Sequence, residues 1–71
     1  MEKVIQLTKR EVEIVRLITK GLNNKEIAEI LYISHHTVKA NLENIFFKTG
    51  MTNRVMLAVW AVKNLGSLEE N

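Results

Sequence analysis

The chain has 71 residues, with 10 basic and 8 acidic side chains and a formal net charge of +2. A chain of this length forms one domain with a small core, and folding buries about 60% of the surface that the unfolded chain exposes. It has no cysteine and no apolar stretch long enough to cross a bilayer, which excludes disulfide scaffolds and membrane-spanning proteins and suits a cytoplasmic location.

The composition predicts an all-α fold, because the chain has no proline and is rich in strong helix formers. The first helix is expected over residues 9 to 20. Thr8 and Glu11 would form a capping box at its start, and Gly21 would end it as a left-handed residue.

The next two helices are predicted over residues 24 to 31 and 35 to 49, with only three residues between them. Asn23 and Ser34 are good N-caps for the two helices. Because so short a connection favours a steep crossing over an antiparallel hairpin, we interpret the pair as a helix-turn-helix. The apolar side chains expected on the core face of the second of these helices are Val38, Leu42, Ile45 and Phe46.

The last helix is predicted over residues 53 to 65, with Gly66 as its stop. The residues expected to face the core from this helix are Val55, Ala58, Ala61, Val62 and Leu65. The four helices would form a four-helix bundle that contains the helix-turn-helix, as one domain with its core in residues 7 to 66. Residues 1 to 6 and 67 to 71 are expected to be flexible ends.

A series of short motifs in this chain resembles the LuxR/FixJ-type (GerE-like) helix-turn-helix domain. The matching motifs are LTxRE at residues 7 to 11, NKEIA at 24 to 28, IS-x-x-TVK at 33 to 39, NI at 44 to 45 and KTG at 48 to 50, followed by Arg54. The resemblance covers residues 7 to 65. It implies a bacterial transcription regulator that binds double-stranded promoter DNA as a dimer, with RNA polymerase as a further partner.

The outward face of the predicted helix 35 to 49 carries the candidates for reading bases, because the N-terminal part of the second helix in such a module enters the major groove. The candidates are His35, His36, Lys39, Ala40 and Glu43. Lys39 can donate to guanine, the methyl group of Ala40 can touch the thymine methyl, and Glu43 can accept from cytosine.

Two positions of the predicted helix 35 to 49 depart from the family pattern. Many relatives have a basic residue where this chain has Glu43, so the alternative for Glu43 is an exposed ion pair with Lys39 at i, i+4. Asn41 stands where the family usually has histidine. Because Asn41 falls near the edge of the core face, we expect it to pack or to contact the backbone.

A separate set of polar side chains is expected to hold phosphates, which fixes the register on DNA without reading sequence. The set is Thr8, Arg10, Asn24, Lys25, Thr37, Asn44, Lys48 and Arg54. Asn24 and Lys25 begin a helix, where exposed amides and the positive end of the dipole attract anions. For each lysine alone, the alternative is a solvated surface charge.

The last helix carries a second apolar strip, which is the candidate dimer interface. It consists of Met56, Val59 and Trp60, with Lys63 beside them. The resemblance favours a homodimer paired through this helix, with half-sites about 34 Å apart. The alternative is that Trp60 packs against the first helix or residues 46 to 50 of its own chain.

The sequence gives no support for a catalytic function. His35 and His36 are adjacent on a helix, so their side chains diverge by about 100° and cannot close on one metal ion. The chain has no aspartate and no glycine-rich phosphate loop, so no enzyme activity, metal or cofactor is predicted. The rival function is a protein-interaction module that uses Phe47, Met56 and Trp60. Two choices stay open: a complete regulator or the output domain of a longer one, and activation or repression.

Overall fold

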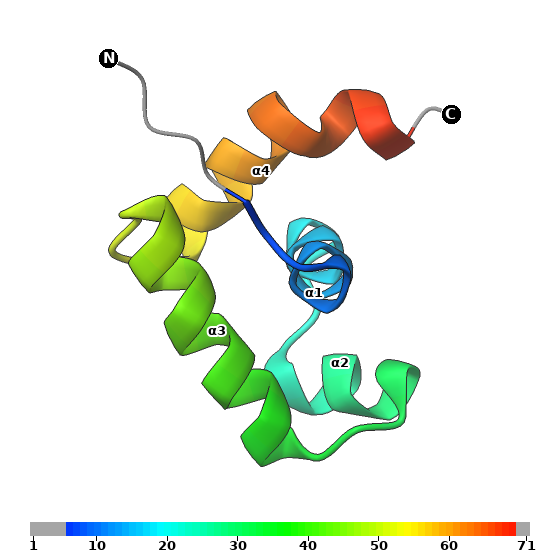
Figure 1. Ribbon diagram of the computed structural model, residues 1–71. Helices are drawn as coiled ribbons and strands as arrows, with labels where there is room; N and C mark the ends of the chain where they lie inside the picture. The colour runs from blue at the N-terminus through cyan, green and yellow to red at the C-terminus, as the bar shows by residue number, and fades with distance from the viewer. Residues whose placement is uncertain (1–5, 70–71) are drawn as a thin grey trace.

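The computed structural model describes residues 6–69, with side chains described as far as Leu65. The elements are α1 (Lys9–Thr19), α2 (Asn24–Leu31), α3 (His35–Thr49) and α4 (Arg54–Glu69), and residues 6–69 contain no strand (Figure 1). The all-α fold with four helices is thereby confirmed. The prediction of flexible ends falls largely on residues 1–5 and 70–71, which lie outside the described residues.

The first helix forms as its capping box predicts. The Thr8 hydroxyl accepts a hydrogen bond from the Glu11 amide at 3.1 Å, and the Glu11 carboxylate accepts one from the Thr8 amide at 2.8 Å. Both donors would otherwise be orphaned at the helix start. Lys20 is the C-cap, and Gly21 follows with a φ of 84°, a conformation that glycine adopts without steric cost.

The helix-turn-helix is held by caps at both of its helix starts. Asn23 and Glu26 form a second capping box, with both hydrogen bonds at 2.8 Å. The Ser34 hydroxyl accepts from the Thr37 amide at 3.0 Å and so begins α3. Between the two helices, Tyr32 takes the left-handed conformation with a φ of 57°, which lets the chain turn within three residues.

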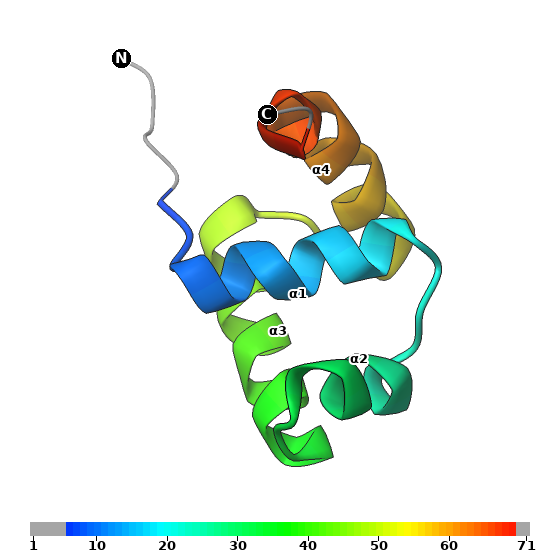
Figure 2. The same ribbon diagram turned by 90° about the vertical axis from the view of Figure 1, so that its right-hand side faces the viewer.

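The central element of the packing is α1, which contacts each of the other three helices. Figure 2 shows α1 lying between α4 on one side and the α2–α3 pair on the other. The buried apolar side chains are Ile14, Val15, Ile18, Ile27, Ala28, Val38, Leu42, Ile45, Leu57 and Ala61. The predicted core face of α3 is therefore confirmed, with Phe46 packed at its margin.

The prediction for the core face of α4 was wrong in part. Among the side chains of this helix that the structure describes, Leu57 and Ala61 are buried, whereas Val55 is 72% exposed and Val62 is 63% exposed. Ala58 and Leu65 pack at the margin of the core. The helix is apolar on nearly all sides between residues 55 and 62, so its hydrophobic pattern does not single out one face.

The predicted end of α4 was also wrong. The helix, which begins at Arg54, continues through Gly66 to Glu69. Glycine stops a helix only where the backbone adopts a positive φ, as Gly50 does at 74° after α3. At residue 66 the chain stays helical instead. No helix within residues 6–69 has both the length and the apolar character needed to cross a bilayer.

Candidate nucleic-acid interface

The outward face of α3 presents every candidate for base reading to solvent. The exposed residues of this helix are His35, His36, Thr37, Lys39, Ala40, Glu43, Asn44 and Phe47. His36, Ala40 and Glu43 follow one another at i, i+4 and i+7, so they form a line along one side of the helix. The opposite side is fixed in the core by fully buried Val38 and Ile45. The core thus sets the rotation of α3 and the face that it shows.

The surroundings of α3 have the geometry of a helix-turn-helix. Figure 1 shows α3 along one edge of the molecule, with its first turns beside α2, and both α2 and α3 contact α1. Two helices therefore hold α3 from behind, while its outer side is uncovered. This arrangement suits a helix that enters the major groove.

The two departures from the family pattern have clear structural environments. Among the described residues no ion pair joins Lys39 to Glu43, so both charged groups remain available to a ligand. Asn41 donates from its side-chain amide to the Thr37 carbonyl at 2.9 Å. The prediction of a backbone contact for Asn41 is thereby confirmed.

Five of the phosphate candidates are exposed on the surface: Thr8, Arg10, Lys25, Thr37 and Asn44. Arg10 lies 3.4 Å from the Glu13 carboxylate, in a pair whose two side chains are each more than 40% exposed. The Thr37 hydroxyl shares a hydrogen bond of 2.9 Å with that of Ser34. Such exposed interactions are weak, so they leave these side chains free to rearrange toward a phosphate.

The three other phosphate candidates, Asn24, Lys48 and Arg54, are half-buried and engaged within the domain. Lys48 donates to the Glu11 carboxylate at 2.8 Å, and the Glu11 side chain is only 4% exposed. Arg54 donates to the Asn24 side-chain oxygen at 2.9 Å and to the Leu22 carbonyl at 2.8 Å. These partners are about thirty or more residues away in the chain, so no local sequence pattern announces them.

The pairing with Lys48 changes the acidity of Glu11. Burial raises the pKa of the Glu11 carboxyl, but hydrogen bonds from Lys48 and Thr8, together with the positive charge of Lys48, lower it more. The pKa of Glu11 therefore lies below its ordinary value, and the carboxylate stays ionised.

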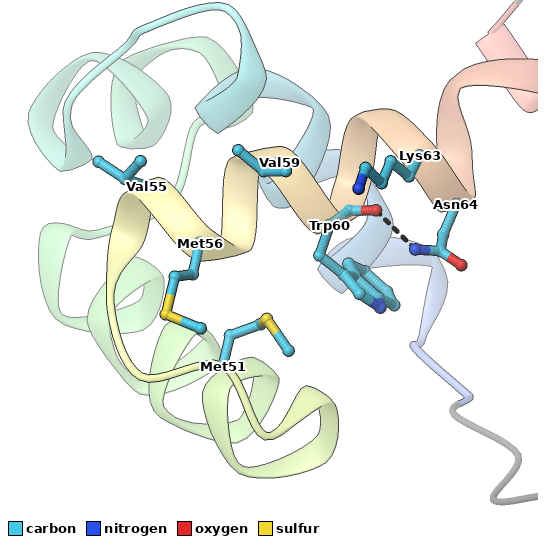
Figure 3. A pocket seen from close by; sticks show the side chains of 7 residues that line it. All are labelled: Met51, Val55, Met56, Val59, Trp60, Lys63 and Asn64. Carbon is cyan, nitrogen blue, oxygen red and sulfur yellow. Dashed lines mark hydrogen bonds between the residues drawn. The ribbon is translucent and has the colours of Figure 1, made fainter.

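The exposed side of α4 forms a shallow apolar groove of about 360 Å³ (Figure 3). Its lining residues are Met51, Val55, Met56, Val59, Trp60, Lys63 and Asn64. Of the predicted dimer residues, Met56 and Val59 are 43% and 51% exposed, and Lys63 is exposed beside them. Trp60 is half-buried against the core, so the alternative of packing within its own chain holds for part of its ring. Val55 lines this groove and Val62 is exposed near it, beside Val59 and Lys63, although the sequence pattern assigned both valines to the core.

Comparison with known proteins gives consistent matches. A family model described as "Bacterial regulatory proteins, luxR family" matches residues 5–61. The transcriptional regulatory protein LiaR of Bacillus subtilis (strain 168) is 48% identical over 58 residues, which are 82% of this chain and 28% of LiaR. LnrK of the same organism is 43% identical over 61 residues, covering 86% of this chain and 28% of LnrK. The oxygen regulatory protein NreC of Staphylococcus aureus (strain JH9) is 47% identical over 57 residues, which are 80% of this chain and 26% of NreC.

This chain spans roughly a quarter of the length of those relatives. The matched region contains the whole of α1, α2 and α3 and the first half of α4. The family consists of regulators of transcription and not of enzymes, which confirms the prediction that the chain is no enzyme. The motifs, the four-helix fold and these matches agree, and the chain belongs to the luxR family of bacterial regulatory proteins, as a helix-turn-helix DNA-binding domain.

Proposed function

We propose that this domain reads a specific duplex DNA site, with α3 in the major groove. The observation that carries this proposal is the uncovered line of His36, Ala40 and Glu43 on a helix whose opposite side is locked in the core. A reading helix must present the same side chains in the same register each time it docks. Burial of Val38 and Ile45 on the far side provides that constancy.

The side chains on this face define the bases that the domain would prefer. Lys39 is a donor that suits guanine O6 and N7, and Ala40 is small enough to let a thymine methyl approach. Glu43 is an acceptor that suits cytosine N4 and that repels the nearby phosphates of a poorly fitted site. His35 and His36, at the start of α3, complete the set. A mixed set of donor, acceptor and methyl groups favours selectivity over general affinity.

Backbone phosphates would be held by the exposed side chains around this face. The set is Thr8, Arg10, Lys25, Thr37 and Asn44, with Asn24 at the first position of α2. We leave Lys48 and Arg54 out of this set, because their donors are directed to acceptors inside the domain. With a net charge of only +2, the phosphate term is modest, so specific contacts must supply much of the affinity.

The domain would act as a homodimer paired through α4. Val55, Val59 and Val62 lie at i, i+4 and i+7 and leave an apolar strip in water, with Met56 and Lys63 beside it. A twofold axis would bring two such strips together and cover them. The two reading helices would then address half-sites about 34 Å apart, and the linked binding of two modules would raise the affinity.

The first experiment is selection of duplexes from a randomised pool, followed by fluorescence anisotropy with the selected duplex and with a scrambled one. Lys39→Ala and Lys25→Ala form a matched pair, since each removes one exposed lysine. We expect Lys39→Ala to lose the preference for the selected duplex, at a cost equivalent to about 1–3 kcal/mol. Lys25→Ala should weaken binding to both duplexes equally. Failure to enrich any sequence would contradict the proposal.

The dimer is tested separately by sedimentation equilibrium of the wild type and Val59→Glu, alone and with a two-half-site duplex. Because Val59 is exposed, the variant should keep its circular dichroism spectrum and its melting temperature at low protein concentration. We expect Val59→Glu to bind one half-site at a time. Cooperative binding of two copies by this variant would exclude α4 as the interface.

A protein-interaction function has one observation in its favour, the exposure of Phe47 at 87%. If the domain binds a protein instead of DNA, Phe47→Ala should abolish that interaction, and selection should enrich no duplex. Under the DNA proposal, Phe47→Ala changes affinity only slightly.

A transcription regulator of this kind would also contact RNA polymerase, in the cytoplasm of a bacterium.

A further inference from the structure

Arg54, the first residue of α4, makes a two-pronged contact with the start of the helix-turn-helix. Its Nη1 donates to Oδ1 of Asn24 at 2.9 Å, and its Nη2 donates to the Leu22 carbonyl at 2.8 Å. Asn24 is the first residue of α2, and Leu22 lies in the loop that leads into it. One planar guanidinium therefore holds both the loop and the first residue of α2.

This contact fixes the orientation of the Asn24 side-chain amide. A guanidinium has only donors, so the group of Asn24 that faces Arg54 must be its oxygen. The amide nitrogen is consequently turned away from Arg54. Among the described residues it has no hydrogen-bond acceptor, and Asn24 itself is half-buried beside exposed Lys25. Arg54 thus leaves a preset neutral donor at the end of α2 that attracts anions.

We propose that Arg54 positions Asn24 to donate to a DNA phosphate, and that Arg54 does not hold a phosphate itself. This inference rests on the proposed DNA-binding function. It assigns the two residues one shared task, although they come from different helices. It also gives the arginine that opens α4 a role in DNA binding through the internal contact, where the sequence pattern alone suggests a direct one.

The chemistry of arginine and lysine separates the two possibilities. Lysine keeps the positive charge and can hold a phosphate as a point charge, but its single ammonium group cannot reproduce the planar fork to two acceptors. Arg54→Lys should therefore weaken DNA binding if the arginine positions Asn24. It should leave binding nearly unchanged if the arginine contacts phosphate directly.

The experiment is a double-mutant cycle of Arg54→Lys and Asn24→Ala, measured by anisotropy with selected and scrambled duplexes over a salt series. We expect each single variant to lose about five- to tenfold in affinity for both duplexes, because a backbone contact carries no sequence information. The double variant should be no weaker than the singles, since both changes remove the same contact. The salt slope should stay at its wild-type value, because Asn24 is a neutral donor.

Three outcomes overturn the inference: wild-type affinity in Arg54→Lys, additive losses in the double variant, or a salt slope reduced by about one in Arg54→Gln with affinity kept in Arg54→Lys. Binding is measured well below the melting temperature of each variant, with the active fraction found by stoichiometric titration. If Arg54→Lys fails to fold, Asn24→Ala decides alone, and wild-type binding by it refutes the assignment.

Lys25→Ala distinguishes failure of this inference from failure of the proposed function. If the wild type binds duplex DNA and Lys25→Ala weakens it while Asn24→Ala and Arg54→Lys do not, DNA binding stands and only the positioning role is lost. If the wild type shows no binding to duplex DNA, both proposals fall together.

Discussion

The ammonium group of Lys48 lies 2.8 Å from the carboxylate of Glu11 and joins the last turn of α3 to the first turn of α1. The same carboxylate oxygen accepts the Thr8 amide at 2.8 Å. One buried oxygen therefore serves both the cap of α1 and the attachment of the reading helix to it.

Replacing Lys48 by methionine should destabilise the domain. The change leaves the buried Glu11 carboxylate without its charged donor, and we expect the free energy of unfolding to fall by about 1–3 kcal/mol. Urea denaturation followed by circular dichroism measures this loss. Lys20→Met is the matched control, because Lys20 is exposed, and it should change stability by less than about 0.5 kcal/mol. Equal midpoints for the two variants would contradict a stabilising role of the ion pair.

Acid should weaken the same attachment. The pKa of Glu11 in the folded state lies below its ordinary value of 4.5, so the folded protein binds the proton less readily than the unfolded chain. The stability contributed by Glu11 is fully present above about pH 4.5 and is lost as the pH falls through the lower, folded-state pKa. Denaturation midpoints of the wild type between pH 7 and pH 3 should therefore fall more steeply than those of Glu11→Gln. Glu29→Gln, on the exposed side of α2, should follow the wild type.

The corrected core face of α4 can be tested with one buried and one exposed residue. Leu57 is fully buried and Val55 is 72% exposed. Leu57→Ala should cost about 2–5 kcal/mol by leaving a cavity, which in so small a domain lowers the melting temperature by roughly 10 °C or more. Val55→Ala should leave it nearly unchanged at protein concentrations too low for pairing. The reverse order of the two melting temperatures would mean that α4 is rotated about its axis.

Gly50 and Gly66 should respond in opposite directions to alanine. Gly50 has a φ of 74°, so an added side chain is strained, although nothing lies within 4 Å of its Cβ position. Gly50→Ala should destabilise the domain by about 1 kcal/mol. Gly66 lies within α4, where alanine is the better helix former, so Gly66→Ala should raise stability by about 0.5–1 kcal/mol. A loss of stability in Gly66→Ala would instead indicate that the helix ends at residue 66.

Tyr32 combines a left-handed backbone with a side chain that is 94% exposed. A tyrosine pays a steric cost for this conformation and gains no burial in return. Tyr32→Asn should therefore raise the melting temperature, because asparagine tolerates the left-handed region better. Tyr32→Val is the counterpart, and its branched side chain should lower the melting temperature. Thermal melts of both variants beside the wild type measure the difference.

Most of the fold could be predicted because it depends on local sequence signals. The starts of α1, α2 and α3 are set by caps whose partners are three residues apart, so Thr8, Asn23 and Ser34 identified them directly. The exposed face of α3 followed from the spacing of Val38, Leu42 and Ile45, which places these three apolar side chains on the opposite side of the helix. These features depend only on neighbours along the chain.

The features that could not be predicted depend on partners far away in the sequence, or belong to a helix without a contrast between an apolar and a polar face. The contacts of Lys48 with Glu11 and of Arg54 with Asn24 join residues 37 and 30 positions apart, and nothing local distinguishes these basic side chains from solvated ones. On α4, apolar residues surround the helix and hide the side that packs on α1. In each case the tertiary arrangement decides, and a single sequence does not encode it visibly.

The outward face of α3 and the apolar strip of α4 share no residue, and their helices are held together mainly through α1. In a paired molecule, α3 would determine which bases are recognised, while the crossing of the two α4 helices would determine how far apart the half-sites stand. The base sequence of the operator and the distance between its half-sites could then change independently of each other. Substitutions on one helix could redirect such a regulator to a new site of the same length, and substitutions on the other could adapt it to a new length of the same site.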